Sequence, residues 1–173
     1  MPWKNFAVMP SGLLQTPELN VAVGVFQNSL GEVLISQRSK EVFSPGAWEF
    51  PGGKLTKFET PLQALKRELY EELGVSVLYV RYLSDTRYDY GNFRVRLFSW
   101  RVLHWDGSVR PLENQVLKWI PLKKLKDQGL LEADISIINI LNRKKVLNID
   151  IYPKLRNFLK LNDLVEKLGS TNS

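Results

Sequence analysis

The stretch from Gly52 to Val75 constrains the chain most, because it places several carboxylates on one short helix. Thr60, Pro61 and Gln63 have the order of an N-cap, a first-turn proline and the third residue of a capping box, which predicts a helix start. Gly74 supplies the matching stop. We therefore expect one short helix between these signals.

An acidic edge follows from the helical repeat of 3.6 residues per turn. Glu68 stands three and four residues before Glu71 and Glu72, so the three side chains project within an arc of roughly 100°. An adjoining apolar stripe, expected to fix the helix to a core, consists of Leu62, Leu65, Leu69 and Leu73. Like charges at this spacing repel by a few tenths of a kcal/mol per pair. A divalent cation bound between the carboxylates would turn this net repulsion into net attraction.

The ligand chemistry favours Mg²⁺, or Mn²⁺, over Zn²⁺, because the donors are carboxylate oxygens and the chain has no cysteine. Arg67 is placed to pair with Glu71 and orient it. The alternative is a solvated face of an ordinary amphipathic helix, since acids at this spacing are common there. The helix alone leaves both interpretations open.

The flanking residues favour a metal site. From Gly53 the chain has Gly, five residues, Glu59, seven residues, Arg67-Glu68-Leu69, one residue, Glu71-Glu72, one residue and Gly74-Val75. This pattern resembles the complete Nudix box, with each defining position filled, and a match of this length is far more specific than a lone glycine motif.

The Nudix resemblance implies an α/β (α+β) fold, an α/β/α sandwich with a mixed central sheet. It also implies metal-assisted cleavage of a nucleoside diphosphate linked to another group. By motif position, Glu68, Glu71 and Glu72 would bind the metal, and Glu68 would also be the base for the attacking water. A backbone carbonyl of Gly52 or Gly53 would complete the coordination. With Arg67, the three glutamates form the predicted catalytic set.

A wider resemblance, to the MutT-type 8-oxo-dGTP diphosphatases, runs without an evident gap from about Val21 to Leu141. It implies that Arg38 contacts base or phosphate, that Phe50 lines the base pocket, and that Glu113 lies near the metals. Lys54 and Arg38 could neutralise phosphate oxygens as charge develops. Without the resemblance, Arg38 would pass as a surface arginine, Phe50 as a core residue and Glu113 as a loop acid.

Asp134 departs from the MutT pattern, which has a purine-reading asparagine at this position. An ionised aspartate only accepts hydrogen bonds and would repel guanine O6. A buried, protonated Asp134 could donate to O6 and accept from the N7–H of 8-oxoguanine. The ionised form could instead accept from an exocyclic amine, which would favour an unoxidised purine or another base. A third possibility is that Asp134 caps a helix that starts near Ile135.

The resemblance implies a Mg²⁺-dependent nucleoside triphosphate pyrophosphohydrolase that sanitises the nucleotide pool and so serves DNA repair, converting 8-oxo-dGTP to 8-oxo-dGMP and pyrophosphate. Two alternatives stay open. One is a Nudix pyrophosphohydrolase for RNA 5′ ends or other nucleoside triphosphates, and the other is a nucleotide-sensing module without catalysis. The intact acidic set argues against the second.

At 173 residues, 44% of them hydrophobic, the chain is long enough for one well-buried domain. We expect an N-terminal leader over 1–18, the Nudix domain over 19–145 and a helical C-terminal extension over 146–173. Of the net charge of +6, residues 143–173 carry seven basic and three acidic side chains, a net of +4. A solvated helix explains this tail better than a nucleic-acid partner does.

Cellular context is constrained by what the sequence lacks. No apolar run approaches membrane-spanning length, and the N-terminus has no signal-peptide pattern. The expectation is a cytoplasmic protein without a membrane partner, a monomer or homodimer, that binds a small nucleotide.

Alternating apolar residues predict a hairpin of strands over 20–27 and 33–37, and a short strand over 48–50. Further strands are expected over 75–83, 86–90, 93–103 and 117–120. A short helix is expected over 121–129 and a packing helix over 133–143.

Overall fold

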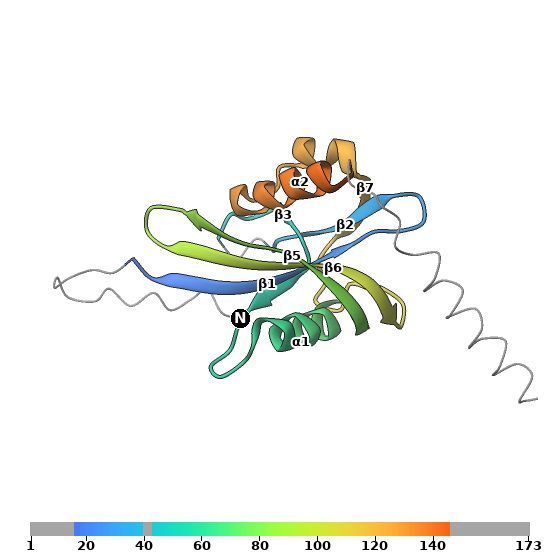
Figure 1. The fold of residues 1–173 in the computed structure, drawn as a ribbon, viewed down its shortest axis with the longest axis horizontal. Coiled ribbons are helices and arrows are strands. Elements are labelled where there is room, and N and C mark those ends of the chain that lie inside the picture. Colours follow the sequence, from blue (N-terminus) through green and yellow to red (C-terminus); the bar gives the residue numbers. More distant parts are fainter. Residues whose placement is uncertain (1–15, 40–42, 146–173) are drawn as a thin grey trace, which may run out of the picture. The chain divides into compact units, whose positions relative to one another are not determined.

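The structure, a computed structural model, describes residues 16–39 and 43–145 of the chain. Seven strands and three helices follow one another in these residues (Figure 1). In chain order they are β1 Glu18–Phe26, β2 Glu32–Gln37, β3 Trp48–Glu49, β4 Gly52–Lys54, α1 Pro61–Leu73, β5 Ser76–Asp89, β6 Arg94–Asp106, β7 Leu117–Pro121, the 3-10 helix η1 Leu122–Gln128, and α2 Glu132–Lys145.

A mixed four-stranded sheet forms the centre, with strand order β4-β1-β6-β5. Its β1 and β6 strands run parallel over nine residue pairs, and the other two pairings are antiparallel. A second, antiparallel sheet has the order β3-β2-β7.

The strand period of two residues divides β1 between two cores. Ala22 and Phe26 join the core on the α1 side, which includes Ala64, Leu65, Leu69 and Leu73 of the helix. Val23 and Val25 join the core that includes Ala133, Ile137 and Ile138 of α2. The two helices lie on opposite sides of the central sheet (Figure 1). This arrangement confirms the predicted α/β/α sandwich with a mixed sheet.

Three details differ from the sequence-based expectations. The predicted hairpin of 20–27 and 33–37 is wrong, because β1 already has β4 and β6 on its two edges. Strand β2 pairs with β3 and β7 instead, and only an isolated bridge joins Gln27 to Val33. The strands predicted over 75–83 and 86–90 form a single strand, β5. Ser84 and Asp85, which lie between the two predicted ranges, also pair with β6 after a register shift. On α1, Leu62 is exposed and Ala64 is buried in its place.

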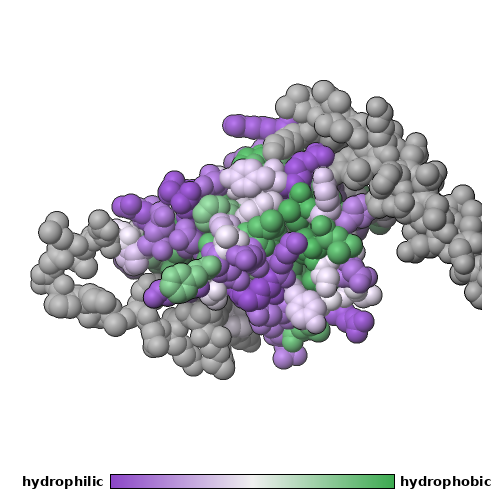
Figure 2. Space-filling model, turned by 60° about the horizontal axis from the view of Figure 1, so that its bottom comes forward, coloured by the Kyte–Doolittle hydropathy of each residue, from purple (hydrophilic) through white to green (hydrophobic). Residues whose placement is uncertain are grey.

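The α1 side of the domain, brought forward in Figure 2, presents mostly hydrophilic surface around a smaller hydrophobic area. No helix within 16–39 and 43–145 combines the length and the apolar character needed to cross a membrane. The predicted C-terminal extension and nearly all of the predicted leader lie outside the described residues. The proposed domain limits therefore stay predictions.

Candidate active site

Helix α1 begins and ends at the predicted signals. The Thr60 hydroxyl accepts a hydrogen bond from the Gln63 backbone N–H at 3.3 Å, and the Gln63 amide oxygen accepts from the Thr60 N–H at 2.9 Å. Gly74 ends the helix in the left-handed conformation, at φ 70°. These local contacts fix the register that brings the acidic edge toward the glycine pair at 52 and 53.

Two of the predicted metal ligands face these glycines. The Gly52 N–H donates to the Glu72 carboxylate at 3.1 Å. A Cβ added to Gly53 would stand 2.3 Å from Cδ of Glu68, so the carboxylate lies directly against the glycine. Gly52 itself has φ 142°, and a Cβ there would meet the Ala22 carbonyl oxygen at 2.1 Å. A side chain at Gly52 would therefore clash with backbone, and one at Gly53 would have to displace the Glu68 carboxylate.

Arg67 holds the neighbouring carboxylates in place. Its Nη1 donates to Glu68 at 2.8 Å and to Glu71 at 3.0 Å, which confirms the predicted pairing with Glu71. Nε and Nη2 donate to the two oxygens of Glu59 at 2.8 and 2.9 Å, and Nη2 also donates to the Lys54 carbonyl at 3.1 Å. The hydrogen bonds from Arg67 hold the pKa of Glu59 at about 2. The pairing with Glu59 was not predicted, although its place in the Nudix box was a signal.

Negative charge is concentrated along this edge of α1. Burial raises the pKa of Glu72 well above its usual range, and the charges of Glu49, Glu68 and Glu113 add to the effect. Burial also raises the pKa of Glu68, with added repulsion from Glu71 and Glu113, while Arg67 opposes the rise. Repulsion of this kind disfavours the ionised carboxylates and would be relieved by a bound cation.

The predicted ligands are only partly gathered. Glu71 turns to Arg67 and is about half exposed, and Glu113 is exposed on the loop that follows β6. Within the described part of the chain, no three His, Cys, Asp or Glu side chains converge closely enough to hold a metal ion. The donor chemistry nonetheless fits a hard divalent cation, because Glu68 and Glu72 supply carboxylate oxygens beside the backbone of Gly52 and Gly53. The metal assignments stay predictions.

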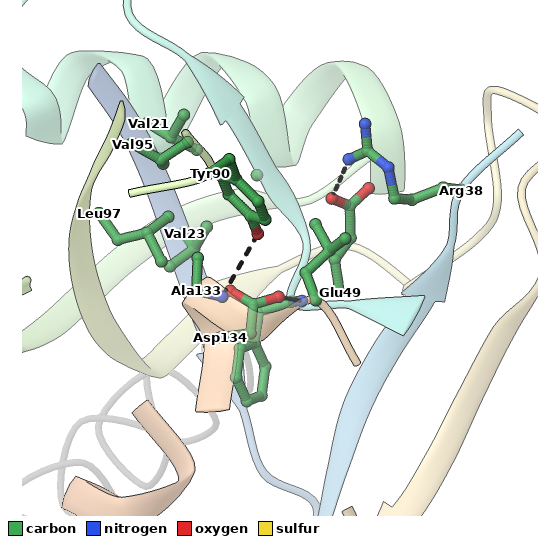
Figure 3. A pocket seen from close by; sticks show the side chains of 12 residues that line it. Val21, Val23, Arg38, Glu49, Tyr90, Val95, Leu97, Ala133 and Asp134 are labelled. Carbon is green, nitrogen blue, oxygen red and sulfur yellow. Dashed lines mark hydrogen bonds and ion pairs between the residues drawn. The ribbon is translucent and has the colours of Figure 1, made fainter. Parts of the chain in front are cut away.

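A pocket brings together three of the four predicted substrate residues, Arg38, Phe50 and Asp134 (Figure 3). Arg38 forms an ion pair with Glu49, which also lines the pocket. Phe50 lines the pocket and is also a core residue, and its contact with a base stays a prediction. The fourth residue, Lys54, ends β4, and its pKa is lowered by burial and by the nearby charge of Arg38. It therefore lies within electrostatic reach of the pocket.

Asp134 is buried, with 3% of its surface exposed, and its carboxylate accepts the Phe50 N–H at 3.2 Å (Figure 3). Burial raises the pKa of Asp134 well above its usual range, and the charge of Glu49 adds to this. The capping alternative is wrong, because α2 starts at Glu132 and Asp134 lies inside its first turn. The neutral carboxyl is thus favoured in the pocket.

Sequence reasoning missed two polar residues of the pocket, Glu49 and Tyr90, as well as its apolar lining other than Phe50. Glu49 follows Trp48 in a short strand, and alternation alone could have placed it away from the core. Tyr90 ends in a hydroxyl that accepts the Ala133 N–H at 3.3 Å, and its ring stacks on Phe93 with centroids 5.0 Å apart. No signal in the sequence connects Tyr90 with the start of α2.

Comparison with known proteins agrees with this geometry. The family model described as the NUDIX domain matches residues 17–139. The chain belongs to the Nudix family. The predicted class, a Nudix-type hydrolase of acid anhydrides, is confirmed by this membership.

Individual Nudix proteins resemble the chain over most of its length. The 8-oxo-dGTP diphosphatase of Escherichia coli (strain K12) is 32% identical over 126 residues, which cover 73% of this chain and 98% of that protein. The CTP pyrophosphohydrolase of the same strain is 32% identical over 108 residues, covering 62% and 80%. Solved structures of MutT from Aliivibrio salmonicida and Vibrio cholerae include one that matches with a TM-score of 0.62 at 26% identity, covering 73% of this chain and 98% of that one. The expected likeness to MutT-type proteins is therefore confirmed.

Proposed function

We propose that this Nudix protein is a divalent-metal-dependent pyrophosphohydrolase that converts a nucleoside triphosphate to a nucleoside monophosphate and pyrophosphate. The observation that carries the proposal is the position of Gly52. Its N–H binds the Glu72 carboxylate, and it also lines the pocket that contains Asp134. A base in the pocket would thus have its phosphates directed toward the acidic edge of α1.

Mg²⁺, or Mn²⁺, is the proposed cofactor, held by Glu68, Glu71 and Glu72 together with Glu113 and a carbonyl of Gly52 or Gly53. When bound, the ion supplies positive charge to the phosphate oxygens and lowers the pKa of a water molecule.

The remaining chemistry belongs to the side chains. Water attacks phosphorus, the phosphoanhydride bond between the first and second phosphates breaks, and Glu68 accepts the proton of the water. Arg67 keeps the Glu68 carboxylate in place through the 2.8 Å hydrogen bond. Arg38 follows β2 and lines the pocket, and Lys54 ends β4 within reach of the Arg38 charge. The charge of both side chains would favour the anionic phosphates.

Base selection is assigned to Asp134. In its neutral form, which burial favours, the carboxyl can donate one hydrogen bond and accept another, which matches the adjacent O6 and N7–H of 8-oxoguanine. The name of the diphosphatase relative agrees with this substrate. Hydrolysis of 8-oxo-dGTP would sanitise the nucleotide pool, serving DNA repair in the cytoplasm.

CTP is the second candidate substrate, and Asp134 in its ionised form favours it. An ionised Asp134 would accept from an exocyclic amine, which cytosine carries and guanine presents elsewhere on its ring. The relative named CTP pyrophosphohydrolase is as similar in identity as the diphosphatase, so names alone do not choose between the bases.

A substrate panel tests the assignment. We would measure kcat/KM with Mg²⁺ for 8-oxo-dGTP, dGTP and CTP, using the unmodified chain and Asp134→Asn. We expect 8-oxo-dGTP to exceed dGTP, and the substitution to change the ratio between bases by about 10-fold or more, the size of one polar contact. Equal kcat/KM for all three nucleotides in both proteins would reject base reading by Asp134.

The catalytic assignment has its own test. Glu68→Gln keeps the size of the side chain but removes its charge and its basicity, so turnover should fall by about 10²- to 10⁴-fold. Glu32→Gln, at the first residue of β2, is the matched control and should retain full activity. Normal turnover by the Glu68 variant would reject the mechanism. Activity on RNA 5′ ends that falls steeply with salt, without activity on free nucleotides, would favour the RNA alternative.

A further inference from the structure

The loop between β6 and β7, residues 107–116, is bound to the C-terminal turn of α1. The last carbonyl groups of a helix have no partners within it. Here the Arg110 N–H donates to the Leu73 carbonyl at 3.1 Å, and the Leu112 N–H donates to the Glu72 carbonyl at 2.9 Å. The loop thereby satisfies the end of the helix that carries the catalytic carboxylates.

Gln115 adds a contact of a different kind. Its Nε2 donates to the same Glu72 carbonyl at 2.8 Å, while its Oε1 accepts from the Glu113 N–H at 2.9 Å. One half-buried amide therefore joins the backbone of a predicted metal ligand on α1 to the backbone of another on the loop. Between Glu113 and Gln115, Asn114 has φ 59°, a left-handed conformation that asparagine tolerates better than most residues.

These contacts enclose Glu113 on both sides. Leu112 is attached before it and Gln115 after it, although the Glu113 side chain itself is exposed. An exposed loop glutamate would ordinarily sample many positions, and the two attachments restrict its backbone to the neighbourhood of Glu72.

We propose that Gln115 is a positioning residue that holds Glu113 beside Glu68 and Glu72, so that the loop glutamate contributes to binding the divalent ion. This inference rests on the proposed function. Gln115 itself touches neither ion nor nucleotide and acts through Glu113.

The amide is the group that this role requires. It donates and accepts at the same time, whereas a glutamate would direct an oxygen at the Glu72 carbonyl. Methionine has a similar length and neither a strong donor nor a strong acceptor, so Gln115→Met removes both contacts with little change in volume. Gln128→Met is the matched control, because the half-buried Gln128 amide also donates to a backbone carbonyl, that of Lys124 at 3.2 Å, within η1.

The experiment measures Mn²⁺ binding to the full chain without nucleotide, by electron paramagnetic resonance of the free ion, and then kcat/KM with Mn²⁺. The proteins compared are the unmodified chain, Gln115→Met, Glu113→Gln, the double variant and Gln128→Met. We expect Gln115→Met and Glu113→Gln each to weaken Mn²⁺ binding by about 10-fold or more. The double variant should be no weaker than the weaker single variant, because the two residues act as a unit. Gln128→Met should bind as the unmodified chain does.

Three results would overturn the inference: unchanged Mn²⁺ binding by Gln115→Met, a double variant whose loss equals the product of the two single losses, or an unmodified chain that binds no Mn²⁺. Failure of the proposed function alone would show as normal turnover by Glu68→Gln, whereas an unmodified chain that binds no Mn²⁺ would overturn both. The binding titration uses no substrate, so it reports on Gln115 whichever nucleotide the enzyme prefers.

Discussion

The carboxylate of Glu68 lies against the Cα of Gly53, leaving no room for a side chain between β4 and α1. The strand and the helix are joined a second time by the hydrogen bond from the Gly52 N–H to Glu72. The proposed base and a proposed metal ligand are therefore positioned by backbone, which cannot change rotamer. Flexible glutamates thus gain fixed positions on a short helix.

Gly53→Ala should separate catalysis from folding. The new Cβ would stand 2.3 Å from Cδ of Glu68 and displace the carboxylate by an ångström or more. A displacement of this size costs about 10²-fold in rate, so kcat/KM should fall by roughly that factor. Gly91→Ala is the control, because nothing lies within 4 Å of a Cβ there. Because Gly91 has a positive φ, Gly91→Ala should be less stable than the unmodified chain, yet its activity should be normal. A fully active Gly53 variant would show that the position of Glu68 is unimportant.

Arg67→Lys tests whether the guanidinium shape matters beyond its charge. Lysine keeps the charge but cannot contact Glu59, Glu68 and Glu71 together. The pKa of Glu59, held at about 2 by Arg67, should rise toward its ordinary value of about 4.3, as measured by NMR titration of the side-chain carboxyl carbons. We expect kcat/KM to fall about 10- to 100-fold, as for other residues that orient ligands. Arg96→Lys, in an exposed pair with Asp85, is the control. Retention of both the low pKa and full activity would contradict the prediction.

The part of the site that sequence could predict is the part built by neighbours along the chain. The capping box, the stop at Gly74 and the pair Arg67 with Glu71 each join residues no more than five positions apart, so helical geometry determines them. Residues 38, 50 and 134 were placed in one pocket only through resemblance to relatives, because no local rule brings distant segments together.

Contacts between distant segments escaped prediction for the same reason. Tyr90 meets Ala133, and Gln115 meets Glu72, each across 43 positions of the chain. The hairpin error has a related cause. Local alternation correctly indicated strands at β1 and β2, but it does not specify partners, and β2 pairs with β3 and β7 while β1 pairs with β4 and β6. Helix α2 begins at Glu132, one residue before the start of the helix predicted over 133–143.

Asp134→Asn should change how stability depends on pH. An unfolded aspartate has a pKa of about 3.9, and burial raises the pKa of folded Asp134 well above that. At a pH between the unfolded and the folded pKa, the folded chain holds a proton that the unfolded chain has lost. The stability that protonated Asp134 contributes is therefore complete below the unfolded pKa and declines as the pH rises toward the folded pKa. Asparagine cannot ionise, and its amide oxygen can still accept the Phe50 N–H. Urea unfolding across pH should therefore show a smaller loss of stability toward neutral pH in this variant. The exposed Asp127→Asn is the control, and equal pH slopes in all three proteins would argue that Asp134 is ionised in the folded state.

Phe58 offers a test of strain beside the catalytic helix. It has φ 68° and is 94% exposed, so a bulky side chain adopts a left-handed conformation with little packing in return. A Cβ in that conformation costs about 1–2 kcal/mol, partly offset by the greater unfolded freedom of glycine. Phe58→Gly should therefore be more stable than Phe58→Ala by up to about 1 kcal/mol, as measured by urea unfolding. Both variants lose the ring and its contact with the Lys57 ammonium, 5.1 Å from the ring centroid, so their difference isolates the backbone. An alanine variant at least as stable as the glycine variant would mean that the left-handed conformation is not maintained in solution.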